Sequence, residues 1–322
     1  MLCGMSSRGS SAPIRSFRPV GVGDRVAVVA PASPVKLEML AMGTDDASRL
    51  GYKPQTRPDI TARWRFTAGS DARRLDELRW ALRDPSLRAV WLARGGYGIT
   101  PLLRHLDPAE LVADPKPIIG ESDATALGCW ALCAGVAWLH GPMVATQLRG
   151  GGDGYDEASL RSALAGEPYR LKGADVSVLA GGRAEGTLWG GCLTLLAALC
   201  GTPWLPRVER GVLVVEDVGV KPYQVHRMLV QLEDAGALEG LAGVILGDFS
   251  GCVQHENQGY DVRDVLADFF RDVAGDVPVT AGWPIGHAPA PHVTLAMGWH
   301  AVLATGNENG NGVATLDLSP PS

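Results

Sequence analysis

Residues 116–134, KPIIGESDATALGCWALCA, place a short apolar strand signal directly before an apolar helix signal. The strand is expected to end at Gly120, and the helix is expected to run from Ala124 to Ala134. Earlier strand and helix signals alternate in the same way, in RVAVVA, SDARRLDELRWALRD and AVWLA (residues 25–30, 70–84 and 89–93). Strands separated by helices predict a parallel sheet with helices on both faces, so the first half is expected to form an α/β domain.

The second half of the chain follows a polar, Gly-rich segment that is expected to be a linker. Beyond it, strands are expected in GVLVVED (211–217) and AGVILGDF (242–249), with a helix around Val225–Ala235 between them. The apolar runs around GNENGNG (306–312) predict a terminal hairpin. We therefore expect a disordered leader, an N-terminal α/β domain, the linker and a C-terminal domain, at residues 1–19, 20–150, 151–183 and 184–322.

Composition and charge exclude several classes of protein. The chain has 322 residues and a net charge of -6 with no basic run, so we expect no nucleic-acid partner. No apolar stretch approaches the roughly 18 residues that cross a bilayer, and the first twenty residues lack the apolar region of a secretory signal. A soluble cytoplasmic protein is expected.

The cysteines and histidines give no sign of a metal site. The six cysteines form no CxxC pair, and no histidine lies close enough in sequence to complete a zinc-finger pattern. We expect free thiols in a reducing compartment and neither metal nor cofactor.

Three polar residues have the types and positions that nucleophilic catalysis needs. A hydroxyl nucleophile works with an imidazole base and a carboxylate that orients it. Ser122 lies at the turn between strand and helix, Glu216 ends the strand LVVE, and His287 lies in the loop WPIGHAPAP. Each also has an ordinary interpretation: a helix N-cap, a solvated strand end and a surface histidine. The local sequence alone leaves both interpretations open.

The turn RGGYG at residues 94–98 follows a predicted strand. It lacks both the GxGxxG spacing and the GK[ST] ending of nucleotide-binding loops. Adjacent glycines let backbone N–H groups approach a substrate carbonyl closely, as an oxyanion hole requires. A tight turn without a further role explains the same residues.

Eight segments in one order resemble the LD-carboxypeptidase family, that is, muramoyltetrapeptide carboxypeptidases of serine peptidase family S66. The resemblance runs from about Val20 to near the C-terminus. The segments are GDRVAVVAPASP, ARGGYG, DPKPIIGESDATAL, HGPM, GTLWGG, VVEDVGVKPYQVHRML, GVILGDF and PIGH.

The resemblance implies an N-terminal α/β sandwich with a mostly parallel sheet and a smaller, β-rich C-terminal domain. It implies that the nucleophile is Ser122, the base His287 and the orienting carboxylate Glu216. The N–H groups of Gly96 and Asp123 would form the oxyanion hole, and Arg94 and Tyr97 would contact substrate. It further implies a homodimer.

The implied reaction is removal of the terminal D-alanine from a muramoyl tetrapeptide during peptidoglycan recycling. Five residues depart from the family pattern and bear on the substrate: Glu121, Cys192, Val220, Pro101 and Ala296. The alternative is a hydrolase of peptidyl or aminoacyl nucleotides of the microcin C immunity type, with Trp189, Trp204 and Trp283 as an aromatic shelf for the base. A catalytically silent peptide-binding protein and an ordinary esterase are disfavoured, the latter because Ser122 does not lie in GxSxG.

Overall fold

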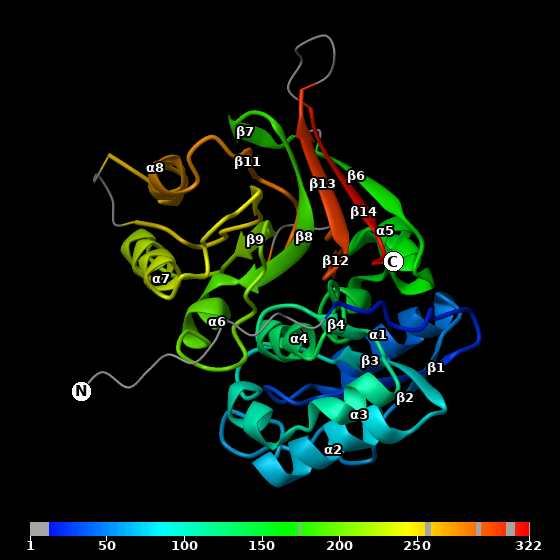
Figure 1. Cartoon of the computed structure of the whole chain (residues 1–322). Helices are drawn as coiled ribbons and strands as arrows, with labels where there is room; N and C mark the ends of the chain where they lie inside the picture. Colours follow the sequence, from blue (N-terminus) through cyan, green and yellow to red (C-terminus); the bar gives the residue numbers. More distant parts are fainter. Residues whose placement is uncertain (1–12, 174, 255–258, 288–290, 307–312, 322) are drawn as a thin grey trace.

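The computed structural model describes residues 13–321 except 174, 255–258, 288–290 and 307–312. It has the expected mixed α/β fold built on two sheets, with one lobe above the other in Figure 1. The expected leader at 1–19 lies mostly outside the described residues. No helix among the described residues has the length and apolar character needed to cross a bilayer.

A six-stranded sheet forms the core of the N-terminal lobe. Its strand order is β12-β5-β4-β3-β1-β2, and every neighbouring pair is parallel except β12 with β5. The strands of its parallel part are β1 (Arg25–Val29), β2 (Lys53–Gln55), β3 (Leu87–Leu92), β4 (Ile118–Gly120) and β5 (Trp138–His140). The helices of this lobe are α1 (Leu37–Arg49), α2 (Asp71–Arg83), α3 (Pro108–Ala113), α4 (Ala124–Cys133) and the 3-10 helix η1 (Thr100–His105).

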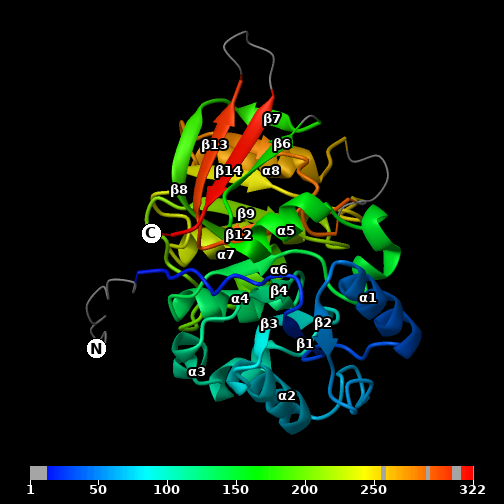
Figure 2. The same ribbon diagram turned by 90° about the vertical axis from the view of Figure 1, so that its right-hand side faces the viewer.

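An eight-stranded sheet forms the second lobe, in the order β6-β14-β13-β8-β9-β10-β11-β7. The four central strands, from β8 to β11, are parallel to one another. Every other neighbouring pair in the sheet is antiparallel. The central strands are β8 (Arg183–Cys192), β9 (Val212–Glu216), β10 (Gly243–Leu246) and β11 (Val279–Ala281). The helices of this lobe, labelled in Figure 2, are α6 (Leu193–Ala198), α7 (Pro222–Asp234) and α8 (Val262–Val273).

The segment that we expected to be a linker, residues 151–183, is instead largely regular structure. It contains the end of η2 (Leu148–Asp153), α5 (Glu157–Ala165), β6 (Tyr169–Gly173) and β7 (Ser177–Ala180). Strands β6 and β7 form the two edges of the eight-stranded sheet. Strand β6 alternates exposed and buried residues, as an edge strand with one solvated face does, whereas the first three residues of β7 are all exposed. Both strands lie in a Gly-rich polar segment, so the composition of that segment resembles a linker.

The chain returns to the first sheet near its end. Strand β12 (Leu295–Met297) pairs antiparallel with β5, with Leu295 opposite His140. The expected terminal hairpin is confirmed as β13 (His300–Thr305) paired with β14 (Ala314–Ser319), while its turn at 307–312 lies outside the described residues. The domain limits that we inferred from composition stay a prediction. Strand β12 lies within the expected C-terminal domain in sequence, but it pairs with a strand of the N-terminal sheet.

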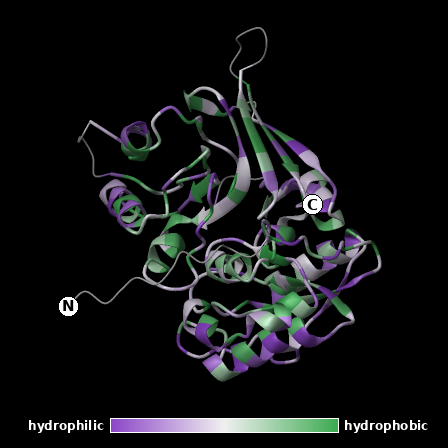
Figure 3. Cartoon of the chain, viewed as in Figure 1, coloured by the Kyte–Doolittle hydropathy of each residue, from purple (hydrophilic) through white to green (hydrophobic). Residues whose placement is uncertain are grey.

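Burial follows the sequence patterns. Nine residues of α4, Ala124–Leu132, are buried. Helices α7 and α8 bury one face only, and both appear two-toned in the hydropathy colouring of Figure 3. Helix α4 is apolar and buried all round because it packs against elements of both lobes, β4 and β5 of the first and α6 and β8 of the second.

Candidate active site

Ser122 lies in a strained turn between β4 and α4. Its φ is 59°, in the left-handed region that costs a residue with a β-carbon about 1–2 kcal/mol. Such a turn is typical of a nucleophile that is exposed at the end of a strand. The N-cap of α4 is Asp123, and among the described residues the Ser122 hydroxyl has no hydrogen-bond partner. Ser122 is therefore not an ordinary N-cap.

The glycine turn packs directly against Ser122. A β-carbon on Gly95 would lie 2.9 Å from the Ser122 Cβ and 3.1 Å from its Oγ. The next residue, Gly96, has a φ of 106°, and a β-carbon there would collide with the Ser33 hydroxyl. Within the described part of the chain, the amides of Gly96 and Asp123 donate to no acceptor. Both amides are free to bind an oxyanion.

Glu216 and His287 form a carboxylate–imidazole pair. The His287 Nδ1 lies 2.8 Å from the Glu216 Oε2. Glu216 is the last residue of β9 and is fully buried, while His287 follows the loop glycine Gly286 and is 23% exposed. A β-carbon on Gly286 would lie 2.2 Å from the Glu216 Oε2, so only glycine leaves room for the carboxylate there.

The environment keeps Glu216 ionised and strengthens His287 as a base. Burial acts to raise the pKa of Glu216, but the interactions with His140 and His287 outweigh it, and the pKa lies well below its usual range. Burial acts to lower the pKa of His287, but the charge of Glu216 outweighs it and raises that pKa. The carboxylate of Glu121, the neighbour of Ser122, raises the pKa of His287 further.

His140 is a site residue that the sequence argument did not single out. It ends β5, opposite Gly120 of β4 in the parallel register, and is fully buried. Its Nε2 lies 3.6 Å from the Glu216 Oε1. The only signal in the sequence was its place in the HGPM segment, where nothing indicated a carboxylate partner.

A hydrogen bond joins the two lobes beside the site. The Cys192 amide donates to the Thr125 Oγ1 at 3.0 Å, and Cys192 lies opposite Glu216 in the β8–β9 register. Thr125 is in the first turn of α4, three residues after Ser122. The strand that carries Glu216 is thereby tied to the helix that follows Ser122.

The buried side chain of Glu121 has polar neighbours. Its Oε1 accepts a hydrogen bond from the Gln147 Nε2 at 2.5 Å, and its Oε2 lies 3.6 Å from the His292 Nδ1. Glu121 is 2% exposed. Glu121, one of the departures from the family pattern, is therefore accommodated by polar partners.

The predicted substrate residues lie at the glycine turn. The Arg94 Nη1 donates to the Pro34 carbonyl at 3.2 Å, and its buried Nε has no acceptor among the residues described. Tyr97 is 51% exposed, and its ring packs edge-on against Phe66 with 5.5 Å between centroids. Phe66, which the sequence did not indicate as a site residue, is thus a second exposed aromatic residue beside the glycine turn.

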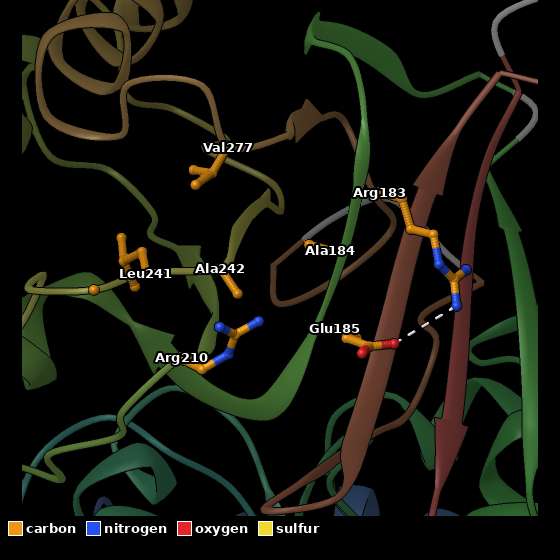
Figure 4. Close-up of a pocket in the computed structure, with 8 residues that line it drawn as sticks. Arg183, Ala184, Glu185, Arg210, Leu241, Ala242 and Val277 are labelled. Carbon is orange, nitrogen blue, oxygen red and sulfur yellow. Dashed lines mark ion pairs between the residues drawn. The ribbon is translucent and has the colours of Figure 1, made fainter.

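A hollow of about 600 Å³ lies away from these residues. Figure 4 shows its lining, including Arg210 and the Arg183–Glu185 ion pair of 3.7 Å. The hollow lies at the N-terminal ends of the parallel strands β9 and β10, whereas Glu216 lies at the C-terminal end of β9. Among the described residues, no group of three or more His, Cys, Asp or Glu side chains has the arrangement of a metal site.

Comparison with known proteins identifies relatives of both halves of the chain. Residues 26–141 match the model of the LD-carboxypeptidase N-terminal domain, and residues 185–303 match that of the C-terminal domain. A Streptomyces coelicolor protein provisionally named as a carboxypeptidase is 38% identical, over 92% of this chain and 94% of its own length. The murein tetrapeptide carboxypeptidase of Pseudomonas aeruginosa is 34% identical, over 88% of this chain and 93% of its own.

Solved structures have the same fold. The crystal structure of muramoyltetrapeptide carboxypeptidase from Oxalobacter formigenes aligns with a TM-score of 0.81 at 30% identity, covering 92% of this chain and 100% of that one. In sequence, the microcin C7 self-immunity protein of Escherichia coli is a more distant relative, at 24% identity over 90% of this chain and 93% of its own length.

Proposed function

The chain belongs to the LD-carboxypeptidase family, and from that membership we propose that it removes the terminal D-alanine from a cell-wall-derived muramoyl tetrapeptide. The observation that carries the proposal is the 2.8 Å pair of Glu216 and His287. Cys192, which lies opposite Glu216 in the sheet, is hydrogen-bonded to Thr125 of the helix that follows the strained turn of Ser122. That arrangement suits acyl transfer through a serine nucleophile.

The proposed reaction has two halves. His287 accepts the hydroxyl proton as the Ser122 oxygen attacks the scissile carbonyl, and Glu216 stabilises the resulting imidazolium. The amides of Gly96 and Asp123 bind the oxyanion. His287 then gives the proton to the leaving amine, the C–N bond breaks, and D-alanine departs from an acyl-enzyme. His287 next accepts a proton from a water molecule that attacks the ester carbonyl. It returns this proton to the Ser122 oxygen as the ester C–O bond breaks and the shortened peptide leaves with a new carboxylate.

Specificity for the last residue would follow from a fixed carboxylate anchor. We propose Arg94 as that anchor, because a guanidinium pairs with a carboxylate through two parallel hydrogen bonds. One added residue moves the terminal carboxylate by about 3.5 Å, more than productive geometry tolerates. A tetrapeptide should therefore be cleaved and a pentapeptide ending in D-Ala-D-Ala should not.

The alternative substrate, a peptidyl or aminoacyl nucleotide, has less support. Two of the three tryptophans considered for a nucleobase shelf, Trp189 and Trp283, are 0% and 1% exposed. A side chain buried in the core offers no face for stacking. Trp204 is partly exposed and remains available.

We further propose that the enzyme needs no metal, works in the cytoplasm in peptidoglycan recycling and forms a homodimer. The chemistry described needs only protein donors and acceptors. Activity should accordingly persist in EDTA, and loss of activity that zinc restores would contradict this proposal.

The deciding experiment is separate incubation with a muramoyl tetrapeptide, the matching pentapeptide and a peptidyl-adenylate analogue, with products identified by mass spectrometry. Release of D-alanine from the tetrapeptide alone is expected. Equal cleavage of both peptides would reject a carboxypeptidase of this specificity, and cleavage of the adenylate alone would establish the alternative.

A further inference from the structure

Glu216 faces a second imidazole besides that of its proposed triad partner. His287 contacts the Oε2 of the carboxylate, and His140 faces its Oε1 with the Nε2 at 3.6 Å. The two histidines come from different lobes: His140 ends β5 of the six-stranded sheet, and His287 follows β11 of the eight-stranded sheet. Nothing in the triad chemistry described above uses His140.

The hydrogen-bonding groups of this contact are unsatisfied. Within the described residues, the Glu216 Oε1 and both ring nitrogens of His140 are buried without a hydrogen-bond partner. Buried polar groups without partners are rare and costly, and each calls for an explanation. A separation of 3.6 Å is too long for a hydrogen bond, yet catalytic hydrogen bonds are often long before substrate binds and tighten in the complex.

The backbone at the end of β4 determines the positions of both His140 and Ser122. His140 lies opposite Gly120 in the β4–β5 register, and the Gly141 amide donates to the Gly120 carbonyl at 3.1 Å. The ring of Trp138 packs edge-on against the imidazole, with 5.8 Å between centroids. The imidazole is therefore fixed relative to the turn that carries Ser122, not relative to β9.

We propose that His140 is a positioning residue that donates its Nε2–H to the Glu216 Oε1 in the working enzyme and so fixes the catalytic carboxylate across the boundary between the lobes. The inference rests on the proposed triad. In this arrangement Glu216 is held between two imidazoles, and a shift of one lobe against the other changes the triad directly.

The consequence for His287 has a definite sign. The groups that act on Glu216 are His287, His140, the adjacent Asp217 and the neighbouring Cys192 of β8. Without the donor from His140, the carboxylate becomes more basic and attracts the His287 proton more strongly. The pKa of His287 then rises. Loss of packing alone would not predict this direction.

The test compares His140→Met, which removes the donor, with His140→Gln, which keeps an N–H at a similar position. His105→Met at the exposed end of η1 is the control. Histidine titrations followed by NMR on the folded, substrate-free protein report the midpoint of His287. We expect His140→Met to raise it by about half a pH unit or more, and His140→Gln and the control to leave it close to wild type.

The same measurement in a Glu216→Gln background completes a double-mutant cycle. Because His140 is proposed to act through the carboxylate, His140→Met should then leave the His287 midpoint unchanged. With tetrapeptide as substrate, His140→Met should lower kcat by about 10- to 100-fold with little change in KM. An unchanged midpoint in folded His140→Met, or an equal shift in both backgrounds, would overturn the inference. Failure of the wild type to cleave the tetrapeptide would overturn only the proposed substrate, since the titrations need none.

Discussion

The His287 Nδ1 lies 2.8 Å from the Glu216 Oε2, with Glu216 fully buried and His287 partly exposed. The carboxylate of Glu216 is therefore shielded from solvent, whereas the imidazole of His287 is accessible to a substrate. Since the charge of Glu216 raises the pKa of His287, the proposed mechanism makes the fraction of neutral imidazole the factor that controls how much enzyme can accept the Ser122 proton.

Activity should rise with pH through a midpoint above the ordinary imidazole value of about 6.5. The raised pKa of His287 means that acid protonates the base at a higher pH than in a free histidine. A profile of kcat/KM against pH measures this midpoint. A midpoint at or below the ordinary value would mean that His287 is not the titrating base.

Replacing Glu216 by Gln should lower kcat by about 10⁴-fold, as the loss of the orienting carboxylate does in serine proteases. The amide keeps the size of the side chain but cannot stabilise an imidazolium. The matched control is Glu185→Gln, at an exposed position of β8. Wild-type rate in Glu216→Gln would assign the orienting role to another carboxylate.

Gly286→Ala should abolish most activity, because the new methyl would lie 2.2 Å from the Glu216 Oε2 and displace the pair. Positive φ adds strain at this residue, so a control with the same strain is needed. Gly282 has a φ of 91°, against 82° for Gly286, and its added methyl would meet nothing closer than 3.8 Å. Gly282→Ala should lose some stability but keep its rate. Equal kcat losses in the two variants would attribute the effect to backbone strain.

Much of the site could be predicted because its pieces are local. The strand, turn and helix around Ser122 follow from the residue types in one short segment, and the glycine turn follows from RGGYG. The pairing of Glu216 with His287 joins residues 71 positions apart, and only the family resemblance brought them together. The local sequence alone left each with an ordinary interpretation.

What could not be predicted depends on register and on contacts between the lobes. His140 meets Glu216 because β4 and β5 align Gly120 with His140, and because β9 ends at the same boundary. The edge strands β6 and β7 were taken for a linker because they are short and lie in a Gly-rich polar segment. The left-handed φ of Ser122 is a property of the turn that no pattern of side chains encodes.

Gly95→Ala should impair the nucleophile without unfolding the protein. Gly95 has no positive φ, so an alanine adds only a methyl, 2.9 Å from the Ser122 Cβ and 3.1 Å from its Oγ. The hydroxyl would have to turn away from an incoming carbonyl, and a displacement near 1 Å costs about 100-fold in rate. Gly21→Ala, whose methyl would have only one neighbour at 3.8 Å, is the control. Normal turnover by Gly95→Ala would remove Ser122 from the reaction.

Ser122 itself offers a test that separates strain from chemistry. Both Ser122→Ala and Ser122→Gly should lose activity by about 10⁶-fold, since each lacks the nucleophile. Their stabilities should differ. Alanine keeps the left-handed penalty of about 1–2 kcal/mol, whereas glycine avoids it and loses about 0.5–1 kcal/mol through its greater freedom when unfolded.

The glycine variant should therefore be more stable than the alanine variant by about 0.75 kcal/mol, the difference between the midpoints of those two ranges. Denaturant unfolding followed by circular dichroism measures the difference. At Ser162, which lies in the interior of α5 and is partly buried, the same pair of substitutions should rank in the opposite order, because glycine destabilises a helix interior. An alanine variant of Ser122 as stable as the glycine variant would mean that the turn relaxes and stores no strain. Residual turnover near a tenth of wild type in either variant would end the case for Ser122 as nucleophile.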